Sequence, residues 1–268
     1  MRPEPRSAIN ELSSERRELW GEIAATHVVD ELKIRRLIKK LDYLVVPSHP
    51  LDSTVAIALH EQSYLYAYQL KTDAALRLLA DAERAGLPSV AATVSRAHIL
   101  YICGDLEMSR RVLLDAELDD VDSSGLAGIA DGCAHSGLFI MAADLYMRAG
   151  KSSGEVSQHL LVAAEIMADV GATDEQVSKR LVTASKIIRS MTSHPHIALD
   201  IFAMHGEGIL YRFMVKDSIE RLLEIDCAID LALSSSYEEA IDQVLSIGVA
   251  PHEDGVVMTA EDGFYVRM

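Results

Sequence analysis

A spacing of about 33 residues recurs in the middle of this chain. Between Ser89 and Gly150, two consecutive segments each contain a helical run, a glycine and a second helical run. Superposing the two segments aligns small or apolar residues in four pairs: Ala97 with Ala130, Ser109 with Ala142, Leu113 with Tyr146, and Ala116 with Ala149. A period near 34 residues, with two helices in each unit, is typical of stacked helical repeats. The sequence therefore predicts a row of helical hairpins.

The same frame extends in both directions along the chain. Shifted upstream by about 34 residues, and downstream by about 35, it again meets small or apolar residues. These positions are Ser63, Ala75, Leu79 and Ala82 upstream, and Val177, Leu181 and Ala184 downstream. Gly86, Gly150 and Gly171 follow apolar helical runs, where a left-handed residue commonly ends a helix. Thr173 and Gln176 have the spacing of a capping box, which predicts the start of another helix.

These units resemble tetratricopeptide repeats, in which a small residue of the first helix packs against a small residue of the second. The first small position holds Ser63, Ala97 and Ala130, the second holds Ala75, Ser109 and Ala142, and a later alanine is matched by Ala82, Ala116, Ala149 and Ala184. Leu59, Thr93 and Leu126 replace the family's early tryptophan, and Glu165 replaces a small residue in a fourth unit. The resemblance covers about half of the chain and implies an all-α fold, a right-handed α-solenoid of such hairpins.

Outside the repeat frame the residue patterns change, and they suggest four parts. Residues 1–50 are predicted to form a tail and a long amphipathic helix that starts at Ser7 or Ser13 and reaches Leu41, and residues 51–191 to form about four repeat units. Residues 192–250 are predicted to form a degenerate repeat and capping helices, with helices at 197–215, 218–233 and 237–247. Residues 251–268 form an acidic segment. In the last part, Asp262-Gly263 separates two short apolar runs, which predicts a short C-terminal β-hairpin.

A basic cluster lies in the second half of the predicted N-terminal helix. It comprises Lys33, Arg35, Arg36, Lys39 and Lys40. A solvated face whose cations favour a helix C-terminus explains such a cluster. Contact with an acidic partner or with a membrane surface is the alternative interpretation.

The overall charge limits the classes of partner. The formal net charge is −16, from 41 acidic and 25 basic residues, so a phosphate backbone would be repelled by most of the surface and nucleic-acid binding is not expected. No apolar run reaches the roughly 18 residues needed to span a bilayer, and no signal peptide is recognisable. Cys103, Cys133 and Cys227 are odd in number and widely separated, which predicts reduced core thiols in a cytoplasmic protein.

The repeat frame also predicts which side chains line the inner face of a solenoid, because first helices contribute most of that face. The predicted groove residues are His60, Tyr64, Tyr68, His98, Tyr101, Asp131, His135, His159 and Asp169. Imidazole and phenol rings combine flat contact area with hydrogen bonding, as peptide-binding surfaces do. The alternative is that these rings are packed or hydrogen-bonded within the protein and bind no partner.

Signatures of catalysis and of metal binding are missing from the sequence. It contains no glycine-rich phosphate loop and no GxSxG elbow, and the Gly206-Glu207-Gly208 run follows no predicted strand. His194, His196 and His205 lie near a proline break, without a cysteine or carboxylate at a recognisable ligand spacing. We therefore expect neither an enzyme, nor a cofactor, nor a metal site.

The predicted function is a non-catalytic interaction with other proteins. A peptide or partner helix would bind in the concave groove, with the chain acting as an adaptor, chaperone or assembly factor. Two alternatives remain open: a regulatory protein that senses a small ligand, and a structural protein that associates with itself.

Overall fold

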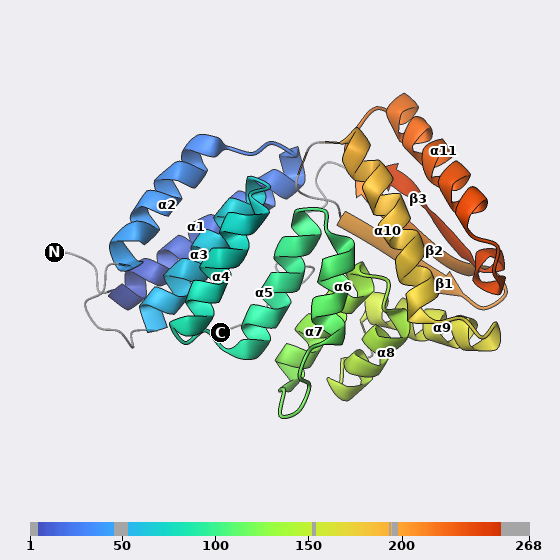
Figure 1. The fold of residues 1–268 in the computed structure, drawn as a ribbon, viewed down its shortest axis with the longest axis horizontal. Helices are drawn as coiled ribbons and strands as arrows, with labels where there is room; N and C mark the ends of the chain where they lie inside the picture. The colour runs from blue at the N-terminus through green and yellow to red at the C-terminus, as the bar shows by residue number, and fades with distance from the viewer. Residues whose placement is uncertain (1–4, 46–52, 152–153, 193, 195–197, 253–268) are drawn as a thin grey trace.

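Helices follow one another along most of the chain, and a small sheet lies near its C-terminal end (Figure 1). The computed structural model describes residues 5–45, 53–151, 154–192, 194 and 198–252. The helices of this part are α1 (Pro5–Thr26), α2 (Glu31–Val45), α3 (Ser53–Tyr68), α4 (Thr72–Arg84), α5 (Ser89–Ile102), α6 (Leu106–Leu114), α7 (Ser123–His135), α8 (Phe139–Arg148), α9 (Glu155–Asp169), α10 (Asp174–Met191) and α11 (Ile219–Ser236). Its strands are β1 (Ala198–Met204), β2 (Gly208–Val215) and β3 (Leu245–Pro251).

Three helical hairpins occupy the middle of the chain, as the spacing predicts. Helix α3 packs on α4, α5 on α6, and α7 on α8, while α1, α3, α5 and α7 contact one another in that order. Gly104 and Gly137 form the turns inside the second and third hairpins with φ values of 87° and 73°, which side chains with a Cβ rarely adopt. Gly86, Gly150 and Gly171 also have positive φ and end their helices as predicted.

Small side chains allow the paired helices to approach closely. Ala97, Ser109, Ala130 and Ala142 are all fully buried. The Ser109 hydroxyl donates a hydrogen bond of 2.9 Å to the Ala97 carbonyl oxygen, so the two small positions of one hairpin touch. A larger side chain at either position would push α5 and α6 apart, because protein interiors are close-packed.

The N-terminal segment differs from its prediction, because the long helix is divided into α1 and α2. His27 has a left-handed φ of 55° and ends α1. The Asp30 carboxylate then accepts hydrogen bonds from the backbone N–H groups of Leu32 and Lys33, at 2.9 and 3.0 Å. Such capping satisfies donors that a new helix leaves unpaired, so Asp30 starts α2. Helix α2 packs on α1 and α3.

The predicted fourth hairpin is not formed by α9 and α10. Helix α9 packs mainly against α8 and β1, whereas α10 packs mainly against α11 and α6. The Asp174 carboxylate accepts hydrogen bonds from the N–H groups of Ile140 and Met141 and so caps α8. The Ser178 hydroxyl donates to the Ser136 carbonyl oxygen at 2.8 Å. Helix α10 therefore lies across the turn between α7 and α8 and does not extend the row.

The prediction of helices at 197–215 and 237–247 is wrong. Strands β1 and β2 form an antiparallel hairpin, and β3 pairs with β2 in parallel, giving the order β1-β2-β3. Exposure along β2 alternates residue by residue, which is the period of a strand with one buried face. Only α11 agrees with its predicted range, and the Ser218 hydroxyl caps it by accepting from the Arg221 N–H. Residues 253–268, which include the predicted C-terminal hairpin, lie outside the described part of the chain.

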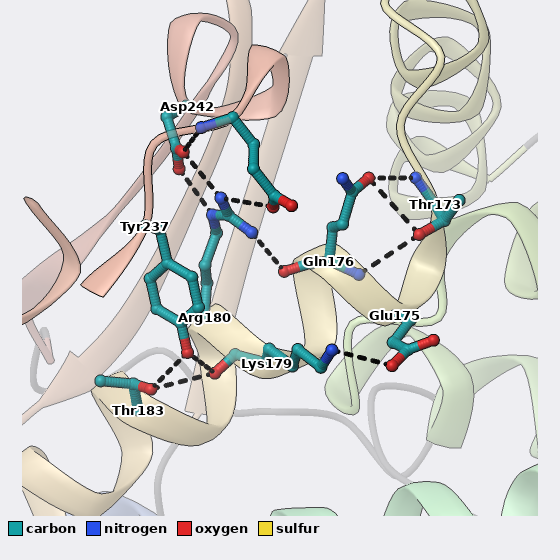
Figure 2. Close-up of polar contacts among 9 residues, drawn as sticks. Thr173, Glu175, Gln176, Lys179, Arg180, Thr183, Tyr237 and Asp242 are labelled. Carbon is teal, nitrogen blue, oxygen red and sulfur yellow. Dashed lines mark hydrogen bonds and ion pairs between the residues drawn. The ribbon is translucent and has the colours of Figure 1, made fainter.

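An arginine buried on α10 holds the segment that leads into β3 (Figure 2). The Arg180 guanidinium donates two hydrogen bonds to the Asp242 carboxylate, at 2.5 and 2.7 Å, and one to Glu239 at 3.0 Å. A fourth bond goes to the Gln176 carbonyl oxygen at 2.8 Å, and the group lies over the Tyr237 ring at 4.4 Å. Because each interaction joins α10 to residues 237–242 or closes within α10, the network attaches the sheet to the helices.

Candidate partner-binding face

The first helices of the three hairpins bring most of the predicted groove residues together. His60 and Tyr64 on α3 have ring centroids 5.2 Å apart, and Tyr64 lies 5.5 Å from His98 on α5. Tyr101 on α5 lies 5.0 Å from His135 on α7. We refer to the rings that connect α3, α5 and α7 in this way as the aromatic row, which comprises His60, Tyr64, Tyr68, His98, Tyr101 and His135.

Helix α1 covers the α3 end of the aromatic row. The Arg16 guanidinium lies 4.7 Å from the centre of the Tyr64 ring and donates a hydrogen bond of 2.7 Å to the Tyr68 hydroxyl. Trp20, one helical turn further along α1, stacks on Tyr68 with centroids 4.7 Å apart and meets His98 edge-on at 6.0 Å. The side chains of Tyr64 and Tyr68 are consequently only 4% and 1% exposed.

The charges beneath α1 are paired. Arg16 forms an ion pair with Glu61, and both side chains are almost fully buried. Burial by itself raises the pKa of Glu61, but the charge of Arg16 and the hydrogen bonds to Glu61 together outweigh it, and the pKa is lowered. Burial lowers the pKa of His60 to about 4, so its imidazole is neutral at pH 7. The His60 Nε2 atom lies 2.7 Å from the Ser95 hydroxyl oxygen.

The α7 end of the aromatic row is only half covered. The Tyr146 phenol donates a short hydrogen bond to the Asp131 carboxylate, and burial together with that negative charge raises the pKa of Tyr146. The His135 Nδ1 atom lies 2.7 Å from the Asp131 carbonyl oxygen. Burial lowers the pKa of His135 to about 4, so this imidazole is also neutral at pH 7. The side chains of Asp131 and His135 are both partly exposed.

The sheet contacts the same end of the row. The Tyr211 hydroxyl on β2 donates to the His135 carbonyl oxygen at 3.3 Å, and the Tyr211 ring stacks near Phe139. His159 on α9 packs on Phe202 of β1, with centroids 5.0 Å apart. Helix α9 therefore borders the sheet.

Asp169 is the predicted groove residue that lies apart from the others. It is exposed in the last turn of α9, and none of the interactions described for the row involves it. His159 is half-buried against β1 rather than against another ring of the row. The structure thus connects the predicted residues of α3, α5 and α7 and leaves those of α9 at the margin.

Sequence reasoning missed several residues that contact the predicted ones, among them Arg16, Trp20, Phe202 and Tyr211. Arg16 and Trp20 are four residues apart, so they lie on one face of α1, and this spacing is visible in the sequence. Tyr211 belongs to an alternating run that predicts a strand when it is examined with a period of two residues. The Gly206-Glu207-Gly208 run follows β1 after all, but it makes the turn between antiparallel strands.

The described residues do not form a metal site or a membrane span. No group of three or more His, Cys, Asp or Glu residues in the described ranges is arranged to hold a metal ion. His205 pairs with Glu165 at 2.8 Å, and His196 lies outside the described residues. Cys133 is buried, but Cys227 is exposed on α11, so the prediction that all three thiols belong to the core is wrong. Among the described helices, none has the length and hydropathy of a membrane span.

Comparison with protein-family models, with curated proteins and with solved structures finds no match to this chain. The arrangement of aromatic rings, neutral imidazoles and a paired buried arginine offers apolar area and hydrogen bonds. It includes no activated nucleophile among the residues that form the row. Of the six rings, only that of His135 is partly exposed, and the other five are buried.

Proposed function

We propose that this protein is a non-catalytic protein-interaction module that binds a peptide or partner helix on the face formed by α5, α7 and α9. In this proposal the hairpins are units of a right-handed α-solenoid similar to tetratricopeptide repeats, and the aromatic row lies on its inner surface. Adaptor, chaperone and assembly factor are the roles that such a surface serves.

One observation carries the proposal: the row already holds a helix of the same chain. Helix α1 inserts an arginine and a tryptophan, four residues apart, against Tyr64, Tyr68 and His98. Arg and Trp are the residue types that most often dominate binding energy when they are buried between aromatic neighbours. An amphipathic helix in an apolar groove is a common mode of peptide recognition.

The partner binds, in this proposal, beyond the region that α1 covers. Asp131, His135 and His159 are half-buried there, and Asp169 is exposed at the edge. The Asp131 carboxylate, which lies one helical turn from the neutral His135 ring, favours a segment that carries a basic side chain together with an aromatic or aliphatic one. The partner's helix would then lie next to α1 along the same face.

The test compares full-length proteins in affinity capture, followed by calorimetry with the captured partner. His159→Ala combined with Asp169→Lys changes the proposed face, whereas Asp144→Lys changes an exposed position on α8. We expect at least a tenfold loss of affinity in the first variant and none in the α8 control. Equal affinity in all three proteins, with melting temperatures unchanged, would show that the partner binds elsewhere.

A further inference from the structure

The outer face of α2 is apolar and basic, and no described element packs on it. Ile34, Leu37 and Leu41 turn inward and are buried. On the opposite side, Leu32 is 64% exposed and Tyr43 is 72% exposed, and Arg35, Arg36 and Lys39 lie between them. The spacing of these residues places them on one side of the helix. We call these five residues the basic face.

The positive charge of the basic face is not neutralised locally. The neighbouring Lys33 and Lys40 are each engaged by a carboxylate of α1, at 2.5 and 2.7 Å. For Arg35, Arg36 and Lys39, by contrast, no ion pair occurs with any residue in the described ranges. A chain with a net charge of −16 therefore presents a local cluster of three cations.

The outer face of α11 is also apolar, but its charged residues are acidic. Leu222, Ile225 and Ile229 are buried beneath the helix. On the other side, Leu223 is 60% exposed and Leu231 is 70% exposed, and Cys227 lies between them.

Two carboxylates border this apolar strip. Glu220 and Asp230 are exposed, and neither forms an ion pair with a described residue. Glu220, Leu223, Cys227, Asp230 and Leu231 make up what we call the acidic face.

We infer that the acidic face of one molecule binds the basic face of a second copy of the same chain. Each face exposes two large apolar side chains that water covers in the monomer, and burying them together is favourable. The exposed charges of the two faces are of opposite sign, which favours this pairing over others. A contact between two acidic faces, or between two basic faces, would bring like charges together.

The position of the two faces determines the form of the assembly. Helices α2 and α11 lie at opposite ends of the long axis of the molecule (Figure 1). Because the two faces of the interface differ, the contact is heterologous and leaves one face of each kind unused in a dimer. Association therefore continues head to tail, into a chain or a closed ring.

The interface is small, which sets its strength. A contact of one helix on another falls below the roughly 1,200 Å² of total buried area that is typical of stable complexes. We therefore expect weak association that depends on concentration. Because salt screens the attraction between the opposite charges of the two faces, we expect the association constant to fall by about tenfold between 20 mM and 500 mM salt.

Charge reversal on the full-length protein tests the inference by analytical ultracentrifugation. One variant carries Arg36→Glu and Lys39→Glu, a second carries Glu220→Lys and Asp230→Lys, and a third carries all four changes. A control carries Arg77→Glu and Lys186→Glu, at exposed positions on α4 and α10, with the same change in net charge as the first variant. All these residues are exposed, so melting temperature and helical content should stay constant.

The expected masses follow from which faces remain complementary. Wild type and control exceed the monomer mass of 29.3 kDa at low salt, and the mass rises with concentration. Each two-residue variant alone stays monomeric, whereas the four-residue variant, with the charges exchanged, associates again.

A wild type that remains at 29.3 kDa up to about 1 mM in low salt would overturn the inference. Persistent association of the first variant would overturn it too, because the contact would then not use α2. Neither outcome bears on partner binding at the aromatic row.

Discussion

Two histidines whose pKa values are lowered should make this protein sensitive to mild acid. Burial lowers the pKa of His60 and of His135 to about 4, from an ordinary value of 6.5. Between these two values the unfolded chain binds more protons than the folded chain. The free energy of unfolding is therefore greatest above about pH 6.5, falls as the pH is lowered, and levels off near pH 4.

The size of the effect follows from the two pKa values. One pKa unit corresponds to about 1.4 kcal/mol. For a group whose pKa shifts from 6.5 to about 4, the loss of stability between pH 8 and pH 5 is about 2 kcal/mol. His60 and His135 together lose about 4 kcal/mol over this interval, which is a large part of the roughly 5–15 kcal/mol that stabilises a typical domain.

Urea unfolding at a series of pH values measures this loss directly. His60→Gln and His135→Gln remove one titrating group each, so each variant should lose about 2 kcal/mol less than the wild type between pH 8 and pH 5. The double variant should lose about 4 kcal/mol less. His205→Gln is the matched control, because the side chain of His205 is 56% exposed. The unfolding free energy of this variant should change with pH as that of the wild type does.

If the histidine variants showed the same dependence of unfolding free energy on pH as the wild type, this account would be refuted. If both single variants lose as much stability on acidification as the wild type, the two imidazoles are not held neutral by burial. Nuclear magnetic resonance provides a second measurement, since the ring proton shifts of His60 and His135 should stay constant from pH 8 to about pH 5. A titration midpoint near 6.5 at either residue would give the same negative result.

Two further predictions concern packing. Arg180→Met leaves Asp242 without its bidentate partner and should lower the free energy of unfolding by about 2–3 kcal/mol in urea. The exposed ion pair between Arg212 and Asp200 serves as the control, because Arg212→Met should lower the free energy of unfolding by less than about 1 kcal/mol. Equal losses in the two variants would show that the burial of Arg180 adds no stability. Ala97→Leu should cost about 2–3 kcal/mol, since Ser109 touches the Ala97 backbone and leaves no room; an unchanged melting temperature would refute this packing.

The repeat frame predicted the three central hairpins because its signals are local. Ala97 and Ala130 recur at a fixed spacing, and both are fully buried where neighbouring helices meet. Gly104 and Gly137 adopt the left-handed conformation that the turns require. The capping box of Thr173 and Gln176 is present at the start of α10. Each of these features depends on residues within about one repeat, so the sequence alone reveals it.

The prediction of helices in the C-terminal region was wrong because its sequence fits both a helical period and the two-residue period of a strand. The run from Ala198 to Val215 is apolar enough to satisfy a helical pattern, yet β2 buries every second residue. Position 208 requires a glycine, since a Cβ there would lie 2.6 Å from the Val244 carbonyl oxygen. That oxygen belongs to the residue just before β3, so the close approach could not be known before the strands were placed.

The sequence by itself determined the elements whose cause is local: helix ends, turns, and the small side chains that let α5 and α6 approach. The tertiary structure alone decided what covers the aromatic row. Trp20 packs on Tyr68 although 48 positions separate them in the chain, and Tyr211 reaches His135 across 76. Such contacts form because burying large rings outweighs the entropy of closing long loops, and no periodicity in the sequence records which distant segments will meet.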